Sequence, residues 1–192
     1  MTFVEAVEFL MPAVDGRGLT WADLGAGSGT FTEALAHLLG PDGTVIAVDN
    51  DPRAVRRLRQ LADRSQPGAA SIEVVKGDLN ALSAIPEPDR GPWQGALLAN
   101  VLHYFQEPGR VLEDVFSRLS HEGRAVVIEY RRATASPWVP YPISPEHLQH
   151  TARASGFGST RIVSERPSRF RGSLYCAVLE PAENHGPRGE RF

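Results

Sequence analysis

The fold of this chain is decided by the stretch Thr20-Trp-Ala-Asp-Leu-Gly-Ala-Gly-Ser-Gly-Thr30. In it an apolar run meets three alternating glycines, Gly25, Gly27 and Gly29, and the amphipathic segment 31–39 follows directly. Glycine takes positive φ freely and lets a ligand lie against the main chain. The stretch therefore predicts a strand, a tight loop and a helix start, a geometry that lets backbone N–H groups approach a bound cofactor.

Strand-like apolar runs alternate with amphipathic segments along the rest of the chain, which predicts a parallel sheet wrapped by helices on both faces. The last two strand candidates, 160–164 and 174–179, have no helix between them and predict an antiparallel hairpin at the sheet edge. We expect one domain over residues 1–180 and a flexible tail over 181–192. The other predicted strands are 19–24, 44–48, 71–76, 95–99 and 124–130, and the predicted helices are 3–10, 30–39, 52–65, 108–119 and 145–156.

Composition is that of an ordinary globular protein, with 42% apolar residues and a formal net charge of −3 over 192 residues. This charge gives no overall basic field for nucleic acid, so nucleic-acid binding is not expected. A local basic cluster, Arg53, Arg56, Arg57 and Arg59, falls on one predicted helix, and we interpret it as a solvated helix face.

Neither a membrane span nor a signal peptide is visible, so we expect a cytoplasmic protein that does not bind membranes. The single cysteine, Cys176, excludes an intramolecular disulfide and a multi-cysteine zinc site, and no metal is expected. Because Cys176 lies in the apolar run 174–179, we interpret it as a buried strand thiol. The sequence does not predict an oligomeric state.

The glycine loop departs from the dinucleotide-binding pattern. That pattern reads Gly-x-Gly-x-x-Gly, whereas Thr30 stands here where the third glycine would allow close helix packing. Asp23, two places before Gly25, would put a carboxylate beside a pyrophosphate. A carboxylate suits instead a cofactor with a cationic amino group or sulfonium.

Five segments, each in or next to a predicted strand, share the pattern of one family. They are Asp23-Leu-Gly-Ala-Gly-Ser-Gly-Thr30, Val45-Ile-Ala-Val-Asp49, Lys76-Gly-Asp78-Leu79, Ala96-Leu-Leu-Ala-Asn100-Val-Leu-His103 and Leu119-Ser-His-Glu-Gly123. In this order they resemble the class I S-adenosylmethionine-dependent methyltransferases. The resemblance implies a Rossmann-like α/β fold with a seven-stranded, mostly parallel sheet in the order 3-2-1-4-5-7-6, strand 7 antiparallel. It also implies S-adenosylmethionine as cofactor and S-adenosylhomocysteine as product.

The resemblance assigns cofactor roles to residues at strand ends. Asp49 would accept hydrogen bonds from both ribose hydroxyls, because a carboxylate offers two oxygens, and Asn50 would line the ribose and adenine edge. Asp78 and the Leu79 N–H would bind adenine, and Asn100 would lie near the methionine amino group. The alternative is that Asp49 and Asp78 only cap a helix and a turn. The implied cofactor-binding residues are Asp23, Gly25, Ala26, Gly27, Gly29, Asp49, Asn50, Asp78, Leu79 and Asn100.

Methyl transfer is an in-line displacement in which the cofactor supplies the activated methyl group. The protein therefore mainly positions the two reactants and excludes water from them. His103, just past the fourth strand, is the candidate base for a hydroxyl acceptor, and packing against a helix is its alternative role. The segment 131–144 carries Trp138, Tyr141 and Arg131, which we expect to form a lid over a small-molecule substrate. A packed crossover onto the sheet is the alternative for this segment.

Two other functional classes stay open. A nicotinamide-dependent oxidoreductase is disfavoured by Asp23 and Thr30. A cofactor-binding module of the same fold without turnover remains possible, since no residue is demonstrably catalytic.

Overall fold

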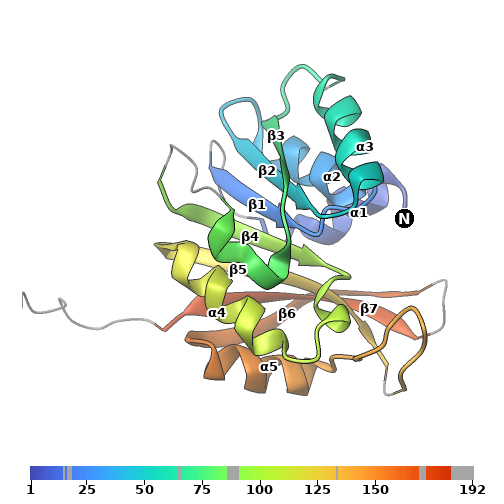
Figure 1. Ribbon diagram of the computed structural model, residues 1–192, viewed down its shortest axis with the longest axis vertical. Coiled ribbons are helices and arrows are strands. Elements are labelled where there is room, and N and C mark those ends of the chain that lie inside the picture. Colours follow the sequence, from blue (N-terminus) through green and yellow to red (C-terminus); the bar gives the residue numbers. More distant parts are fainter. Residues whose placement is uncertain are drawn as a thin grey trace, which may run out of the picture.

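The computed structural model describes residues 1–14, 16, 19–64, 66–85, 91–132, 134–168 and 172–182. Its centre is one seven-stranded sheet (Figure 1). The helices are α1 (Phe3–Leu10), α2 (Thr30–Leu39), α3 (Pro52–Ala62), α4 (Pro108–Arg118) and α5 (Pro145–Ala154), with the short 3-10 helices η1 (Leu79–Ala84) and η2 (Leu102–Tyr104). The strands are β1 (Thr20–Leu24), β2 (Thr44–Asp49), β3 (Ser71–Lys76), β4 (Trp93–Ala99), β5 (Leu119–Arg131), β6 (Phe157–Pro167) and β7 (Ser173–Pro181).

The strand order is β3-β2-β1-β4-β5-β7-β6, which confirms the predicted fold class. Strands β1 to β5 pair in parallel, whereas β7 runs antiparallel to both β5 and β6. Parallel strands all end at one edge of a sheet, so the loops that follow β1, β2, β3, β4 and β5 meet there. That edge is where the predicted site residues are brought together.

Two apolar layers hold the helices against the two faces of the sheet (Figure 1). Leu10 of α1 and Leu35 of α2 pack with Trp21 on one face, and Leu58 of α3 packs on Ala47 of β2 on that same face. The other face is covered by α4 and α5. Along β2, side chains alternate between the layers because successive strand residues point to opposite faces. None of the helices in the described ranges is long and apolar enough to cross a membrane.

Several element ends differ from the prediction. The fifth strand begins at Leu119, five residues before the predicted start, because Leu119 already pairs with Trp93, and regular pairing resumes at Arg124. A register shift between Trp93 and Gly95 accommodates the added length. Strands β6 and β7 are also longer than predicted, and β7 includes Pro181, which the prediction gave to the tail. Residues 183–192 of that tail lie outside the described residues.

Candidate active site

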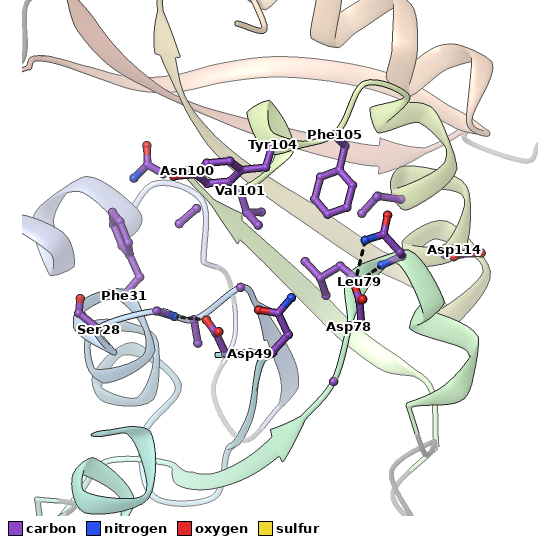
Figure 2. Close-up of a pocket in the computed structure, with 18 of the residues that line it drawn as sticks. Ser28, Phe31, Asp49, Asp78, Leu79, Asn100, Val101, Tyr104, Phe105 and Asp114 are labelled. Atoms are coloured by element: carbon purple, nitrogen blue, oxygen red, sulfur yellow. Dashed lines mark hydrogen bonds between the residues drawn. The ribbon is translucent and has the colours of Figure 1, made fainter. Parts of the chain in front are cut away.

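A cavity of about 980 Å³ opens at the carboxyl ends of β1 to β4 (Figure 2). This volume lies at the upper end of the range for small-molecule sites, roughly 300–1,000 Å³. Its walls come from the glycine loop, the residues that follow β2 and β3, the η2 turn and the first half of α4. Of the predicted cofactor-binding residues, those that line the cavity are Gly25, Ala26, Gly27, Asp49, Asn50, Asp78, Leu79 and Asn100.

Three N–H groups of the glycine loop are already bonded to β2. The Val48 carbonyl accepts from Gly25 at 2.9 Å and from Ala26 at 3.0 Å, and the Gly27 N–H donates to Oδ2 of Asp49 at 2.8 Å. These three N–H groups are therefore used within the protein, although their residues line the cavity. A pyrophosphate binds through such N–H donors, so their use within the protein disfavours a dinucleotide.

Two glycines of the loop have different roles. Gly27 has a φ of 57°, and a Cβ built on it would meet only the Gly25 carbonyl, 3.8 Å away, so a ligand can approach its backbone. Gly29 has a φ of 86°, and a Cβ there would lie 2.9 Å from Cδ2 of Leu61 and 3.2 Å from Cδ2 of Leu58, both on α3. Gly29 therefore lets α2 pack closely on α3, and it does not line the cavity.

The carboxylates at the ends of β2 and β3 face the cavity and also make local bonds. Oδ1 of Asp49 accepts the Asp51 N–H at 2.9 Å, while Asp51 itself caps α3. Oδ1 of Asp78 accepts from the backbone and the side chain of Asn80 at 2.9 and 3.0 Å and so caps η1. Because a carboxylate has about four acceptor positions, both groups keep acceptor capacity for the donors of a ligand.

Two further oxygen acceptors are buried without a partner in the described part of the chain. Asp23 is fully buried and accepts a 2.6 Å hydrogen bond from the Thr32 hydroxyl on Oδ2, whereas its Oδ1 has no donor. Burial raises the pKa of Asp23 to about 7 against the opposing Thr32 hydrogen bond, and the charge of Asp49 adds to the rise. Asp23 lies next to the loop without lining the cavity.

Asn100 is the second such acceptor, and it does line the cavity. Its Oδ1 is buried without a donor among the described residues. Its φ of 56° is the only positive value for a non-glycine residue in those ranges. Backbone in this region is uncommon outside glycine and tends to mark functional sites.

The charge of the cavity wall is negative. Four carboxylates line it against one guanidinium, Arg110, whose Nε is bonded to Glu107 at 2.7 Å. Such a wall favours a cation over an anion by simple Coulomb attraction. Together with the unpartnered oxygens, it fits the ammonium, sulfonium and ribose hydroxyls of S-adenosylmethionine. The carboxylates are Asp49, Asp78, Glu107 and Asp114.

The predicted base, His103, lies beneath the cavity wall and does not line it. It is 1% exposed, with Nδ1 at 2.7 Å from Oε2 of Glu129 and its backbone N–H at 3.2 Å from Oε1. The ring of Tyr104, centred 4.4 Å from the imidazole, reaches the cavity instead (Figure 2). His103 therefore sets the position of a wall residue.

The segment predicted to form a lid lies beside the cavity and does not line it. Arg131 pairs with Glu165 through two bonds of 2.9 and 3.2 Å. The Tyr141 N–H donates to the His103 carbonyl at 3.0 Å, which fastens the segment to the η2 turn. Trp138 is 80% exposed. In this structure all three residues are held away from the cavity.

Sequence reasoning missed several residues of the wall. Phe31 opens α2 directly after the glycine loop, and Phe105 and Asp114 come from the η2–α4 region that follows β4 (Figure 2). Their position after a parallel strand is a signal that could have found them, since ligands bind at the carboxyl ends of such strands. Met1 also lines the cavity, and no sequence pattern indicates it.

Comparison with known proteins agrees with this geometry. The chain is 32% identical over 130 residues to an ornithine lipid N-methyltransferase of Singulisphaera acidiphila, covering 64% of each chain. It is 29% identical over 120 residues to a 2-phytyl-1,4-naphtoquinone methyltransferase of Thermosynechococcus vestitus, covering 62% of this chain and 50% of the relative. The chain thus spans less than two thirds of the length of these curated relatives.

The fold also matches a solved structure, a SAM-dependent methyltransferase from Aquifex aeolicus. The TM-score is 0.70 at 19% identity, over 91% of this chain and 89% of that one. A family model described as "Methyltransferase domain" matches residues 15–165, most of the chain. With the strand order and the acidic cavity at the strand ends, this match shows that the chain belongs to the class I S-adenosylmethionine-dependent methyltransferase family.

Proposed function

We propose that this protein transfers a methyl group from S-adenosylmethionine to a small-molecule acceptor by in-line displacement. One observation supports this most: the cavity at the strand ends presents acceptor oxygens and net negative charge, while the loop N–H groups are used internally. The cofactor supplies an activated methyl group on a good leaving group. The protein then contributes orientation and exclusion of water.

In this proposal the cofactor lies along the four strand ends. Asp49 and Asn50 bind the ribose, and Asp78 with the Leu79 backbone binds the adenine. Asn100 receives the ammonium of the methionine part, which lies over Gly25, Ala26 and Gly27. Asp23, next to the loop, offers the unpartnered Oδ1 of its buried carboxyl group to that end. This assignment rests on the unpartnered oxygens and on the lining of the cavity.

The acceptor side is proposed to be the part of the cavity near Met1, Phe31 and Tyr104. Figure 2 shows the aromatic rings of Phe31 and Tyr104 on one side of the cavity and the carboxylates of Asp78 and Asp114 on the other. Such a surface suits an acceptor with an apolar portion, as the names of the ornithine lipid and phytyl-naphthoquinone relatives also suggest. Proton removal by His103 would require the η2 turn to open, because that side chain is buried and bonded to Glu129.

The cofactor assignment is tested by calorimetry with S-adenosylmethionine, S-adenosylhomocysteine and NAD. We expect the first two to bind at the same site and NAD to show no binding. Binding of NAD without binding of S-adenosylmethionine would contradict the proposal.

Turnover is tested by following S-adenosylhomocysteine release with a panel of amine-bearing lipids, quinols and phenols. We expect product with at least one apolar acceptor. Tight cofactor binding with no turnover on any panel member would support the binding-module alternative.

A further inference from the structure

The outer face of α3 carries a concentrated positive charge. Its arginines are all exposed, and none of their guanidinium groups makes a hydrogen bond or ion pair with any residue in the described ranges. Two aspartates, Asp51 and Asp63, flank the helix against five arginines, so the segment 51–64 has a net charge of +3 while the whole chain has −3. The arginines are Arg53, Arg56, Arg57, Arg59 and Arg64.

This charge begins at the edge of the sheet where the cavity opens. Strands β2 and β5 run parallel to β1 and β4, so α3 and the segment 131–144 both start at that edge. Arg53, Arg56 and Arg57 lie in the first two turns of α3, nearest to the edge. Figure 1 shows α3, the N-terminus and the segment after β5 on the same side of the molecule.

Exposed aromatic and apolar side chains accompany the arginines at this edge. Tyr104, 55% exposed, and Met1 belong to the cavity wall. Tyr141 is exposed and is fastened to the turn that carries Tyr104. Trp138 of the same segment is 80% exposed, whereas Trp21 and Trp93 are 1% exposed. The edge therefore combines unpaired cations with the residue types that favour a membrane interface.

We propose that this edge docks on the surface of an anionic lipid bilayer, with the first turns of α3 over the headgroups and Trp138 and Tyr141 in the interface. We choose an anionic bilayer as the partner because of charge complementarity. Each arginine near an anionic surface raises the binding affinity several-fold. The aromatic and apolar side chains favour a bilayer over RNA, because they gain from insertion into an interface. The cluster on α3 is then a binding face, in place of the solvated face expected from sequence.

Docking at this edge places the cavity mouth toward the bilayer. Met1 and Tyr104, which line the cavity, are part of the same exposed set. An acceptor with an apolar portion could then pass from the lipid to the site without crossing water. This consequence rests on the proposed function, whereas the docking itself rests only on charge and exposure.

The docking is tested with the full chain by co-sedimentation with vesicles. We use phosphatidylcholine vesicles and vesicles in which about one third of the lipid is phosphatidylglycerol, at about 0.1 M and 0.5 M salt. We expect binding to the mixed vesicles at low salt and release at high salt. Equal binding to both vesicle types, or no vesicle binding together with binding to a single-stranded RNA, would overturn the proposal.

Matched charge variants locate the binding face. The double variant Arg56→Gln/Arg57→Gln is compared with Arg153→Gln/Arg161→Gln, which removes the same charge from exposed positions on α5 and β6. We expect the first pair to weaken vesicle binding about 30-fold and the second pair to change it by less than about threefold. An equal loss of vesicle binding in both double variants would show that the protein is attracted to the vesicle by its overall charge and not through one face, which would overturn the proposal. Both variants are checked for S-adenosylmethionine binding, which neither should alter.

The emission of Trp138 reports the orientation. Because the other two tryptophans are buried, mixed vesicles should shift the emission to the blue, and the Trp138→Phe variant should lose the shift. Vesicle binding without a blue shift would overturn the orientation. Neither measurement needs turnover, so failure of docking and failure of methyl transfer are distinguishable.

Discussion

Nδ1 of His103 lies 2.7 Å from Oε2 of Glu129, with both side chains buried. The other carboxylate oxygen accepts the His103 backbone N–H, and no other described residue donates to this carboxylate. One carboxylate of β5 thus holds both the ring and the backbone of the η2 turn. Through the His103 carbonyl, the same turn also holds Tyr141.

Glu129→Gln should loosen the acceptor wall more than the cofactor site. Glutamine replaces one of the two carboxylate oxygens by an NH₂ group and removes the negative charge, so one of the two bonds to His103 is lost. We therefore expect the free energy of unfolding to fall by about 1–3 kcal/mol. The acceptor KM should rise several-fold because Tyr104 loses its support, while S-adenosylmethionine affinity changes little. Urea unfolding, calorimetry and steady-state kinetics measure the three quantities.

A double-mutant cycle with His103→Asn provides the control. The two changes should be coupled by at least about 1 kcal/mol, because the residues act through each other. Additive effects, or an equal loss of cofactor and acceptor binding, would show that the pair does not position the wall.

Asp49→Ala should weaken S-adenosylmethionine binding by about 1–3 kcal/mol, the scale of lost charged hydrogen bonds. Asp51→Ala is the matched control, since it removes the same charge two residues away and costs about 1 kcal/mol of stability through loss of the α3 cap. Calorimetry should show unchanged affinity for the control. If the two variants bind the cofactor equally well, Asp49 has no role in the site.

Stability should fall as the pH rises from about 4 to about 7 because of Asp23. Its pKa is about 7 in the folded chain against 3.8 ordinarily, so in this window the folded state holds a proton that the unfolded state has lost. The loss from this group is on the order of 4 kcal/mol and levels off above pH 7. Urea unfolding across this range measures it.

Asp23→Asn should remove this dependence, because an amide does not titrate. The difference in stability between the variant and the original chain should therefore grow in the variant's favour as the pH rises. A parallel pH profile for both proteins would place the titration on another group.

Gly27→Ala and Gly29→Ala should separate binding from folding. Both positions have positive φ, which costs an alanine about 1 kcal/mol or more. At Gly29 the new methyl also meets Leu61, so the larger loss of thermal stability is expected there. At Gly27 the methyl enters the cavity, so the larger loss of S-adenosylmethionine affinity is expected there. The reverse ranking would contradict the roles assigned to the two glycines.

The family resemblance carried the strand order, and the sequence motifs themselves were sufficient for the strand-end residues of the cavity. Glycines, alternating apolar runs and acids at strand ends are local patterns, and Asp49 and Asp78 lie where these patterns place them. The pairing of His103 with Glu129 spans 26 residues and depends on how β4 and β5 align. No local pattern encodes such an alignment. Packing of His103 was an alternative from sequence, but its bond to Glu129 could not be anticipated.

The contribution of α4 to the cavity wall and the full length of β5 could not be predicted from the sequence for a related reason. Asp114 faces the cavity only because α4 packs back on the sheet at a particular angle. The pair Glu122-Gly123 has the composition of a turn, yet Leu119 before it already pairs with Trp93 of β4, so the strand begins ahead of that pair. In both cases tertiary contacts override local preference.

The bond from the Gly27 N–H to Asp49 means that the floor of the site is assembled before any ligand arrives. Because the end of β2 fixes the loop of β1, the protein does not have to order this backbone on binding, and that entropy is already lost during folding. A carboxylate that both fastens the loop and faces the cavity also links the shape of the floor to its charge. Exchange of that single side chain would change the rigidity of the site together with its affinity.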